Sequence, residues 1–228
     1  MLKPNENELN QLSYNDSLKL DKRNFLQYYY SLIITKHPLF FTFCVNDYNF
    51  RYIKIYLFFY NFAVYFTVNS LFFTDSTMHK IYEEQSSYDI IDNIPQIIYS
   101  CIISVILNTC LRILAVTEST IIKFKNQKKV KNLLENSKKI QKCLKIRFML
   151  FFIFSLILLI FFWYYTSCFC AVYKNTQFHL IKDTIVSYVS SLLTPFAVYI
   201  LPGLLRIPSL RKNNKKYIYN FSKILQII

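Results

Sequence analysis

Four long apolar stretches interrupt a chain that is otherwise polar and charged. They cover residues 55–73, 94–111, 148–173 and 185–205, and none of them contains Asp, Glu, Lys or Arg. A bilayer core is crossed by about 20 mostly apolar helical residues, and each stretch has about that length. A helix of a soluble protein would carry a polar face over such a length. The pattern predicts an all-α fold, an integral membrane helical bundle with four transmembrane helices.

The segments around these stretches give the expected domain organisation. Residues 1–50 are a polar and basic N-terminal segment that is expected on the inner side of the membrane. Residues 51–212 form the four-span membrane domain, and residues 213–228 form a basic C-terminal tail. The sequence thus predicts one membrane domain flanked by two basic ends.

The distribution of basic residues indicates an orientation. Seven Lys and Arg precede the first stretch, one lies in residues 74–93, ten in residues 117–147, two in residues 174–184, and six follow the fourth stretch. Short loops rich in Lys and Arg stay on the cytoplasmic side. We therefore predict both termini on the cytoplasmic side of a plasma membrane or endomembrane. The Phe-, Tyr-, Asn- and Lys-rich composition leaves the mitochondrial inner membrane as an alternative.

The composition excludes several classes of enzyme. The chain is 54% hydrophobic and has a single glycine, Gly203, whereas average usage is roughly 7% glycine. One glycine cannot build a phosphate-binding loop, a dinucleotide fingerprint or a GxSxG turn. His37, His79 and His179 lie in separate segments, and the six cysteines lack the spacing of a metal site. We predict no enzymatic activity, no catalytic, metal or cofactor-binding residues, and no cofactor.

Polar and small side chains form stripes on three of the four apolar helices. Residues three or four positions apart share a helix face, and a polar face within a membrane turns toward other helices or a wet cavity. The candidates for helix packing or for a lining are Asn61, Tyr65 and Asn69 in the first helix, Cys101, Ser104, Asn108 and Arg112 in the second, and Ser187, Ser190, Ser191, Thr194 and Pro195 in the fourth.

Two interpretations of the stripes stay open. Helix packing uses small residues and polar pairs, each worth about 0.6–2 kcal/mol. A hydrated lining for ions or a small solute would use the same faces. Such a path usually contains an ionisable group near the middle of the membrane, whereas the only charge in the stripes, Arg112, lies at a helix end. The sequence favours packing, with a lining as the alternative.

Prolines shape the fourth apolar helix. Pro195 has no backbone N–H to donate, so a kink is expected there. Pro202, Gly203 and Pro208 are expected to end the helix near the inner surface, where Arg206 and Arg211 would act as interfacial anchors.

The most basic segment is the loop between the second and third apolar helices. Residues 123–147 carry apolar side chains near helical spacing, at Val130, Leu133, Leu134, Ile140 and Leu144. We predict an amphipathic helix that either extends the flanking helices or lies on the inner leaflet. The lysines from Lys123 to Lys145 would there attract anionic lipids, at about 1 kcal/mol for each lysine. Nucleic-acid binding is not expected, because topology accounts for this charge, and a partner-binding helix is a further alternative.

Two stretches resemble a known group of proteins. Residues 70–100 contain SLFFTDSTMHKIYEEQSSYDIIDNIPQIIYS, and residues 161–210 contain WYY, FCAVYKNTQ, HLIKDT and LPG. Both resemble the C-terminal multi-pass membrane region of large repeat-containing transmembrane proteins of ciliates and related protists. The resemblance covers roughly residues 30–212 and implies a membrane anchor, but it brings no catalytic residue. A more distant similarity to the polycystin-type membrane region implies a channel.

Together these patterns predict a role without catalysis. We expect a structural anchor or subunit of a membrane complex, in contact with the lipid bilayer and with other membrane subunits or copies of itself. The alternative is a channel or transporter subunit that uses the same polar helix faces as a lining.

Overall fold

The computed structural model describes residues 4–44, 48–73, 75–84, 94–125, 133–211 and 215–226, and every regular element in them is a helix. The predicted all-α class is therefore confirmed for the described residues. The chain divides into two compact units. Unit 1 comprises Met1–Asp47 with Leu192–Ile228, and unit 2 comprises Tyr48–Ser191.

Three helical segments in the described part are long and apolar enough to cross a membrane. They are Ile94–Ala115, Leu134–Val172 and Lys174–Arg211, and they correspond to the second, third and fourth predicted stretches. The first predicted stretch is helical as well, as α5 (Arg51–Leu71), but it is not one of the three. Its tyrosines, its two asparagines and Lys54 lower its mean hydropathy. The described residues thus contain three candidate membrane spans.

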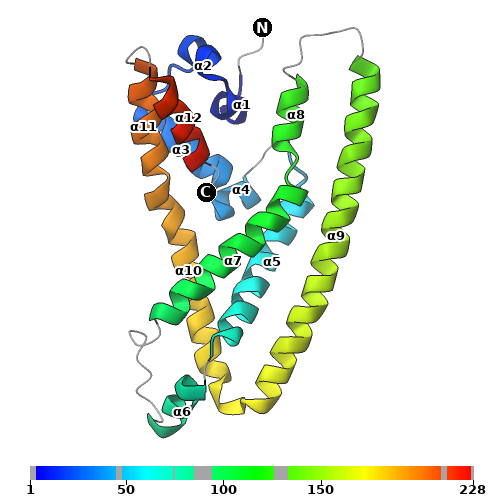
Figure 1. Ribbon diagram of the computed structural model, residues 1–228, viewed down its shortest axis with the longest axis vertical. Coiled ribbons are helices and arrows are strands. Elements are labelled where there is room, and N and C mark those ends of the chain that lie inside the picture. Colours follow the sequence, from blue (N-terminus) through cyan, green and yellow to red (C-terminus); the bar gives the residue numbers. More distant parts are fainter. Residues whose placement is uncertain are drawn as a thin grey trace. The chain divides into compact units, whose positions relative to one another are not determined.

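The helices of unit 2 follow one another from the first to the fourth predicted stretch (Figure 1). After α5 come α6 (Asp75–Glu84), α7 (Ile94–Ala115), α8 (Glu118–Lys125), α9 (Leu133–Val172), the 3₁₀ turn η3 (Lys174–Thr176) and α10 (Gln177–Val198). The end of α10 belongs to unit 1.

The core of unit 2 forms where α5 packs against α7 and α9. Its buried side chains are Tyr60, Val64 and Val68 of α5, Leu111 and Ala115 of α7, and Phe151 and Phe162 of α9. The Tyr56 hydroxyl donates a hydrogen bond of 3.3 Å to Ser155 Oγ on α9. Because α5 contributes to the centre of this core, it holds the two neighbouring candidate spans together.

Helix α9 is a single helix of 40 residues, about 60 Å long. Its apolar part leaves large side chains exposed, such as Trp163 at 76%. Its basic first turns continue directly into the apolar part (Figure 1). On its C-terminal side the basic loop therefore extends the flanking helix, because α9 begins at Leu133. On its N-terminal side it does not, because α8 is a separate helix that begins at Glu118, with two residues between it and the end of α7. Residues 126–132 lie outside the described part.

Arg147 of α9 stabilises the end of α7. Its guanidinium donates to the carbonyl oxygens of Ile113 and Val116, the second at 3.1 Å, and to Thr120 Oγ1 at 3.2 Å. The last carbonyls of a helix have no partner within the helix. A positively charged donor there satisfies them and complements the helix dipole.

Unit 1 contains six short helices and the end of α10. They are α1 (Glu6–Gln11), α2 (Tyr14–Leu20), α3 (Phe25–Lys36), α4 (Pro38–Phe43), α11 (Ile200–Arg211) and α12 (Lys216–Leu225). Asn5, Ser13 and Asn24 cap the first three, each accepting a hydrogen bond from the backbone N–H three residues later. These capping residues explain why the N-terminal segment folds into several short helices.

The fourth predicted helix continues further than expected. Helix α10 passes through Pro195 and ends at Val198, and α11 runs from Ile200 to Arg211. The prediction that Pro202 and Gly203 end the helix was therefore wrong. The break lies at Tyr199, because Pro202 has no N–H to bond the carbonyl of Val198 four residues earlier.

Gly203 allows α11 to approach α3 closely. A Cβ atom at this position would lie 2.7 Å from the Phe25 ring of α3. The single glycine of the chain therefore serves helix packing.

Arg206 lies at the centre of unit 1 and is fully buried. Its Nη2 is 2.9 Å from Asp21 Oδ2 and 2.8 Å from the Leu9 carbonyl oxygen. The guanidinium carbon lies 5.0 Å from the Tyr28 ring centroid and 4.8 Å from that of Tyr219. The expectation of a surface anchor was wrong for Arg206, because the N-terminal segment folds over it and supplies its partners.

Asp21 holds two arginines. It pairs with Arg206 and also with Arg23, whose Nε is 2.8 Å from Asp21 Oδ1. Burial alone would raise the pKa of Asp21, but the hydrogen bonds and charges of Arg23 and Arg206 outweigh it and hold that pKa below its ordinary value. The carboxylate is the shared counterion of this buried cluster.

We predict that Asp21→Asn destabilises unit 1 by about 3–5 kcal/mol, because it leaves Arg206 buried without its counterion. Hydrogen exchange of α11 amides in the detergent-solubilised full chain measures this change. The control is Asp16→Asn, an exposed carboxylate of the same unit, for which we expect a change within about 0.5 kcal/mol. Equal protection of α11 in both variants would contradict the prediction.

Unit 1 should also lose stability in acid, in two ranges of pH. Burial lowers the pKa of His37, although a hydrogen bond with the Leu192 carbonyl opposes the shift. Below about pH 6.5 an unfolded histidine binds a proton more readily than His37 does, so the free energy of unfolding falls with pH. The lowered pKa of Asp21 adds a second loss below about pH 4. Hydrogen exchange against pH measures both, and His37→Gln should remove only the first.

Candidate functional site

The buried polar side chains of unit 2 lie mainly on α5, α7 and α10. The first contact joins two of the predicted stripes, because Asn108 Nδ2 donates a hydrogen bond to Asn61 Oδ1. The same Nδ2 also donates to the Ser104 carbonyl oxygen at 2.8 Å. The predicted stripes of the first and second apolar helices thus face each other.

A second contact joins α10 to both of these helices. Ser187 Oγ donates a hydrogen bond to Asn69 Oδ1 of α5 at 3.3 Å. Both residues are fully buried. Asn69 Nδ2 in turn donates to the Tyr65 carbonyl oxygen at 2.9 Å. The Cys101 thiol of α7 lies 3.7 Å from the Ser187 carbonyl oxygen. Members of all three stripes therefore meet at Ser187.

Aromatic rings close this junction on one side. The Tyr188 ring of α10 lies edge-on to the ring of Tyr65, with centroids 5.7 Å apart. It has similar contacts with Phe58 and Phe62 of α5. The contact between α5 and α10 thus combines a polar pair with an aromatic cluster.

The remaining stripe residues differ in exposure. Ser190 and Thr194 are exposed, while Arg112 and Pro195 are half-buried. The Ser191 hydroxyl donates to the Tyr188 carbonyl oxygen of its own helix at 2.7 Å. Ser191 also forms a side-chain hydrogen bond with Tyr65 of α5. The contact between α5 and α10 therefore extends from Ser187 to Ser191.

Sequence reasoning missed buried polar residues near the start of α10 and α7. Asp183 and Thr184 are fully buried, and so is Ser100 of α7. Asp183 is four residues before Ser187, so the helical spacing could have included it in the stripe. Within the described residues, the hydroxyls of Thr184 and Ser104 are buried without a hydrogen-bond partner. Asp183, Thr184 and Ser100 therefore extend the polar surface beyond the predicted set, which already contained Ser104.

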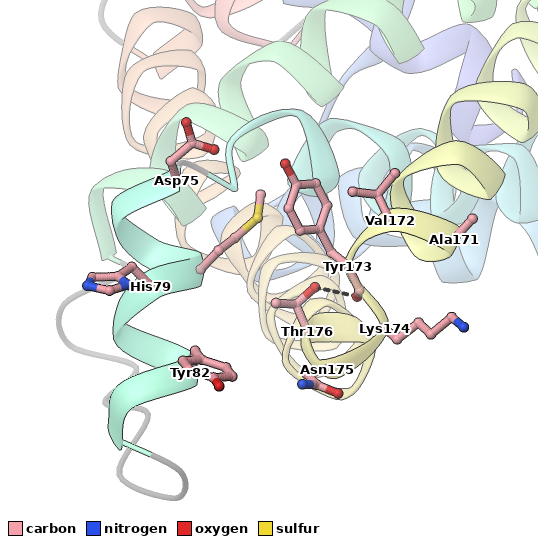
Figure 2. A pocket seen from close by; sticks show the side chains of 10 residues that line it. Asp75, His79, Tyr82, Ala171, Val172, Tyr173, Lys174, Asn175 and Thr176 are labelled. Atoms are coloured by element: carbon pink, nitrogen blue, oxygen red, sulfur yellow. Dashed lines mark hydrogen bonds between the residues drawn. The ribbon is translucent and has the colours of Figure 1, made fainter.

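A pocket of about 570 Å³ lies between α6 and the turn that follows α9. Asp75, His79 and Tyr82 reach it from α6, and the backbone turn from Tyr173 to Thr176 forms its other side (Figure 2). Thr176 Oγ1 donates to the Tyr173 carbonyl oxygen at 2.9 Å and holds this turn. His79 pairs with Glu83 at 3.1 Å, and both side chains are exposed. The pocket is an open, mixed polar and apolar surface.

The polar junction consists of amides, hydroxyls, the Cys101 thiol and aromatic rings. Among the described residues, no group of three or more His, Cys, Asp and Glu could hold a metal ion. None of the six cysteines is in a disulfide bond. What the junction can do is join helices or contact a small polar species.

Comparisons with known proteins do not assign this chain to a family. No protein family, curated protein or solved structure matches the chain.

The Asn61–Asn108 pair gives a direct test of the contact between α5 and α7. We predict that Asn108→Ala lowers thermal stability in detergent by about 0.6–2 kcal/mol, because it removes the bond between the helices. A double-mutant cycle with Asn61→Ala should show coupling, since the two side chains act on each other. The matched control is Thr109→Ala, whose hydroxyl bonds only its own helix at Val105. Additive effects of the two alanine variants would refute the contact.

Proposed function

We propose that this chain is a multi-pass membrane protein that acts as a structural anchor or subunit of a membrane complex, without catalysis of its own. The observation that supports this best is that polar stripes on α5, α7 and α10 bond to one another, at Asn61–Asn108 and at Asn69–Ser187. Side chains that are engaged with each other hold helices together and leave less polar surface for a water-filled path.

The proposal includes α5 as a fourth span. Its polar residues Thr67, Asn69 and Ser70 are each at most 2% exposed, whereas Phe59 and Leu71 are 65% and 50% exposed. A helix with a buried polar face and an exposed apolar face suits a lipid environment. Four spans place both termini on the same side, which the distribution of Lys and Arg assigns to the cytoplasm of a plasma membrane or endomembrane.

Exposed apolar surface supports lipid as the immediate partner. On α9 the large side chains Phe161 and Trp163 are 56% and 76% exposed, and on α7 Ile106 is 58% exposed. The basic first turns of α9 and the end of α8 are exposed too, so the lysines between Lys123 and Lys145 can meet anionic headgroups or an acidic partner. Further membrane subunits or a second copy would pack on the outer face of α10 at Ser190 and Thr194. The resemblance to the C-terminal region of large ciliate membrane proteins agrees with an anchor.

One observation favours a second candidate, a channel or transporter subunit. The buried hydroxyls of Thr184 and Ser104 have no hydrogen-bond partner in the part of the chain that the structure describes. Thr184 lies one helical turn from Ser187, and Ser104 lies one turn from Cys101. Buried polar groups of this kind are often satisfied by water or an ion. A hydrated lining would therefore include this part of α7 and α10.

Purification of the tagged full chain from its native membrane in mild detergent distinguishes these functions. We expect a larger membrane protein to co-elute in fixed stoichiometry, identified by its mass and by peptide sequencing. The double variant Ser190→Ala and Ser191→Ala should leave ion flux through proteoliposomes at the background of empty vesicles, because these residues do not line a path. The Thr109→Ala variant, prepared in the same way, serves as the control for effects of purification and reconstitution. Flux that depends on Ser191 without a change in assembly would overturn the anchor in favour of the channel.

A further inference from the structure

Helix α12 is amphipathic, but its apolar face is exposed and its polar face is packed against the protein, the reverse of the arrangement in a soluble protein. Its packed face is polar and its outward face is apolar: Tyr217 is 81%, Phe221 45% and Ile224 58% exposed, whereas Tyr219 and Ser222 are fully buried. The three exposed residues are spaced by four and three positions, so they form one stripe. The surroundings of this stripe decide what the helix does.

The polar face of α12 is bound to the N-terminal segment. The Tyr219 hydroxyl donates to the Leu12 carbonyl oxygen at 2.9 Å and lies 2.6 Å from Ser17 Oγ. Lys223 Nζ donates to the Gln11 carbonyl oxygen at 2.9 Å. The Tyr219 ring also lies against Arg206. These contacts fix the rotation of α12, so the apolar stripe must face outward from unit 1.

The outward stripe continues the surface of a candidate membrane span. Helix α12 packs along α11 (Figure 1), and α11 is the last part of the candidate span Lys174–Arg211. On α11 itself Leu201 and Leu204 are 52% and 55% exposed. Lipid that covers the exposed side of α11 therefore meets α12 beside it.

The charge around α12 suits an anionic surface. Residues 184–228 contain no Asp or Glu, and Lys215 and Lys216 at the start of α12 are exposed. Interfacial helices combine an apolar face with lysines that reach the headgroups. Arg206, by contrast, is buried and paired with Asp21, so it does not contribute positive charge to the outer surface.

We propose that α12 is a membrane-interface helix: Tyr217, Phe221 and Ile224 enter the boundary between headgroups and acyl chains of the leaflet that α11 reaches, and Lys215 and Lys216 bind anionic phospholipid headgroups there. This inference rests on the membrane assignment of the proposed function. Helix α12 would then be a second membrane contact of the chain, in addition to the spans. Because the N-terminal segment is hydrogen-bonded to α12, this contact would also keep that segment near the membrane.

Tryptophan fluorescence of the full chain in liposomes tests the proposal. The vesicles contain phosphatidylcholine with a minority of phosphatidylglycerol, with or without brominated acyl chains, which quench nearby indoles. Trp163, the only tryptophan of the chain and 76% exposed on α9, reports whether the protein is in the membrane at all. In a Trp163→Phe background, Phe221→Trp then reports on α12. A second variant, Tyr217→Trp, covers the case in which the first fails to fold.

We expect brominated lipid to quench the probe at position 221 to a degree comparable with Trp163, while iodide in the buffer quenches it weakly. Brominated phosphatidylglycerol should quench it more than brominated phosphatidylcholine, and Lys215→Gln with Lys216→Gln should reduce this preference, by up to about fivefold for each lysine. Quenching by iodide alone would place α12 in water and overturn the proposal. Protection from both quenchers would mean that a second copy or another protein covers the stripe, which also overturns it. If Trp163 itself is not quenched by brominated lipid, the membrane assignment fails instead.

Discussion

A polar side chain that water does not reach must find its hydrogen-bond partner in the protein, and the rest of this structure depends on that constraint. In unit 2 it pairs Asn61 with Asn108 and Asn69 with Ser187, and these pairs set the faces on which α5, α7 and α10 meet. The apolar side chains are then left to face outward, as on α9. The helices of unit 2 thus bury polar pairs beside an apolar core and leave many large apolar side chains exposed, an arrangement that suits apolar surroundings.

In unit 1 the buried polar group that needs partners is a charged one, the guanidinium of Arg206. The guanidinium of Arg206 is fully buried, and it is stabilised by the carboxylate of Asp21, by backbone carbonyls and by two tyrosine rings. These partners come from the N-terminal helices and from α12, so one arginine requires distant parts of the chain to fold together. A buried ion pair contributes little net stability compared with apolar packing, but the loss of one partner is costly. Its main effect is therefore to specify which segments pack on α11.

The sequence predicted the candidate spans and the inward faces of helices well, but it did not predict which distant residues contact one another. The length and evenness of residues 148–173 were sufficient for a candidate span, and the three-and-four spacing placed Asn108 and Ser187 on inward faces. Nothing in the sequence indicated that residues 1–50 would fold over Arg206, because the ion pair joins Asp21 with a residue 185 positions later. Charge patterns gave Arg206 the same expected role as any arginine at a helix end. The break at Tyr199 was misplaced because the effect of Pro202 falls four residues before the proline.

The inverted faces of α12 bear on the choice between an anchor and a channel. A channel needs a continuous polar path, and the polar face of α12 is already occupied by Leu12, Ser17 and Gln11. The polar contacts of both units are likewise made between helices of the chain. Surface that remains outside is apolar on α9, α11 and α12, and such surface binds lipid or other membrane helices. The distribution of polar groups therefore favours attachment over transport. The buried hydroxyls of Thr184, Ser104 and Tyr188, which have no hydrogen-bond partner among the described residues, are places where a hydrated path could begin.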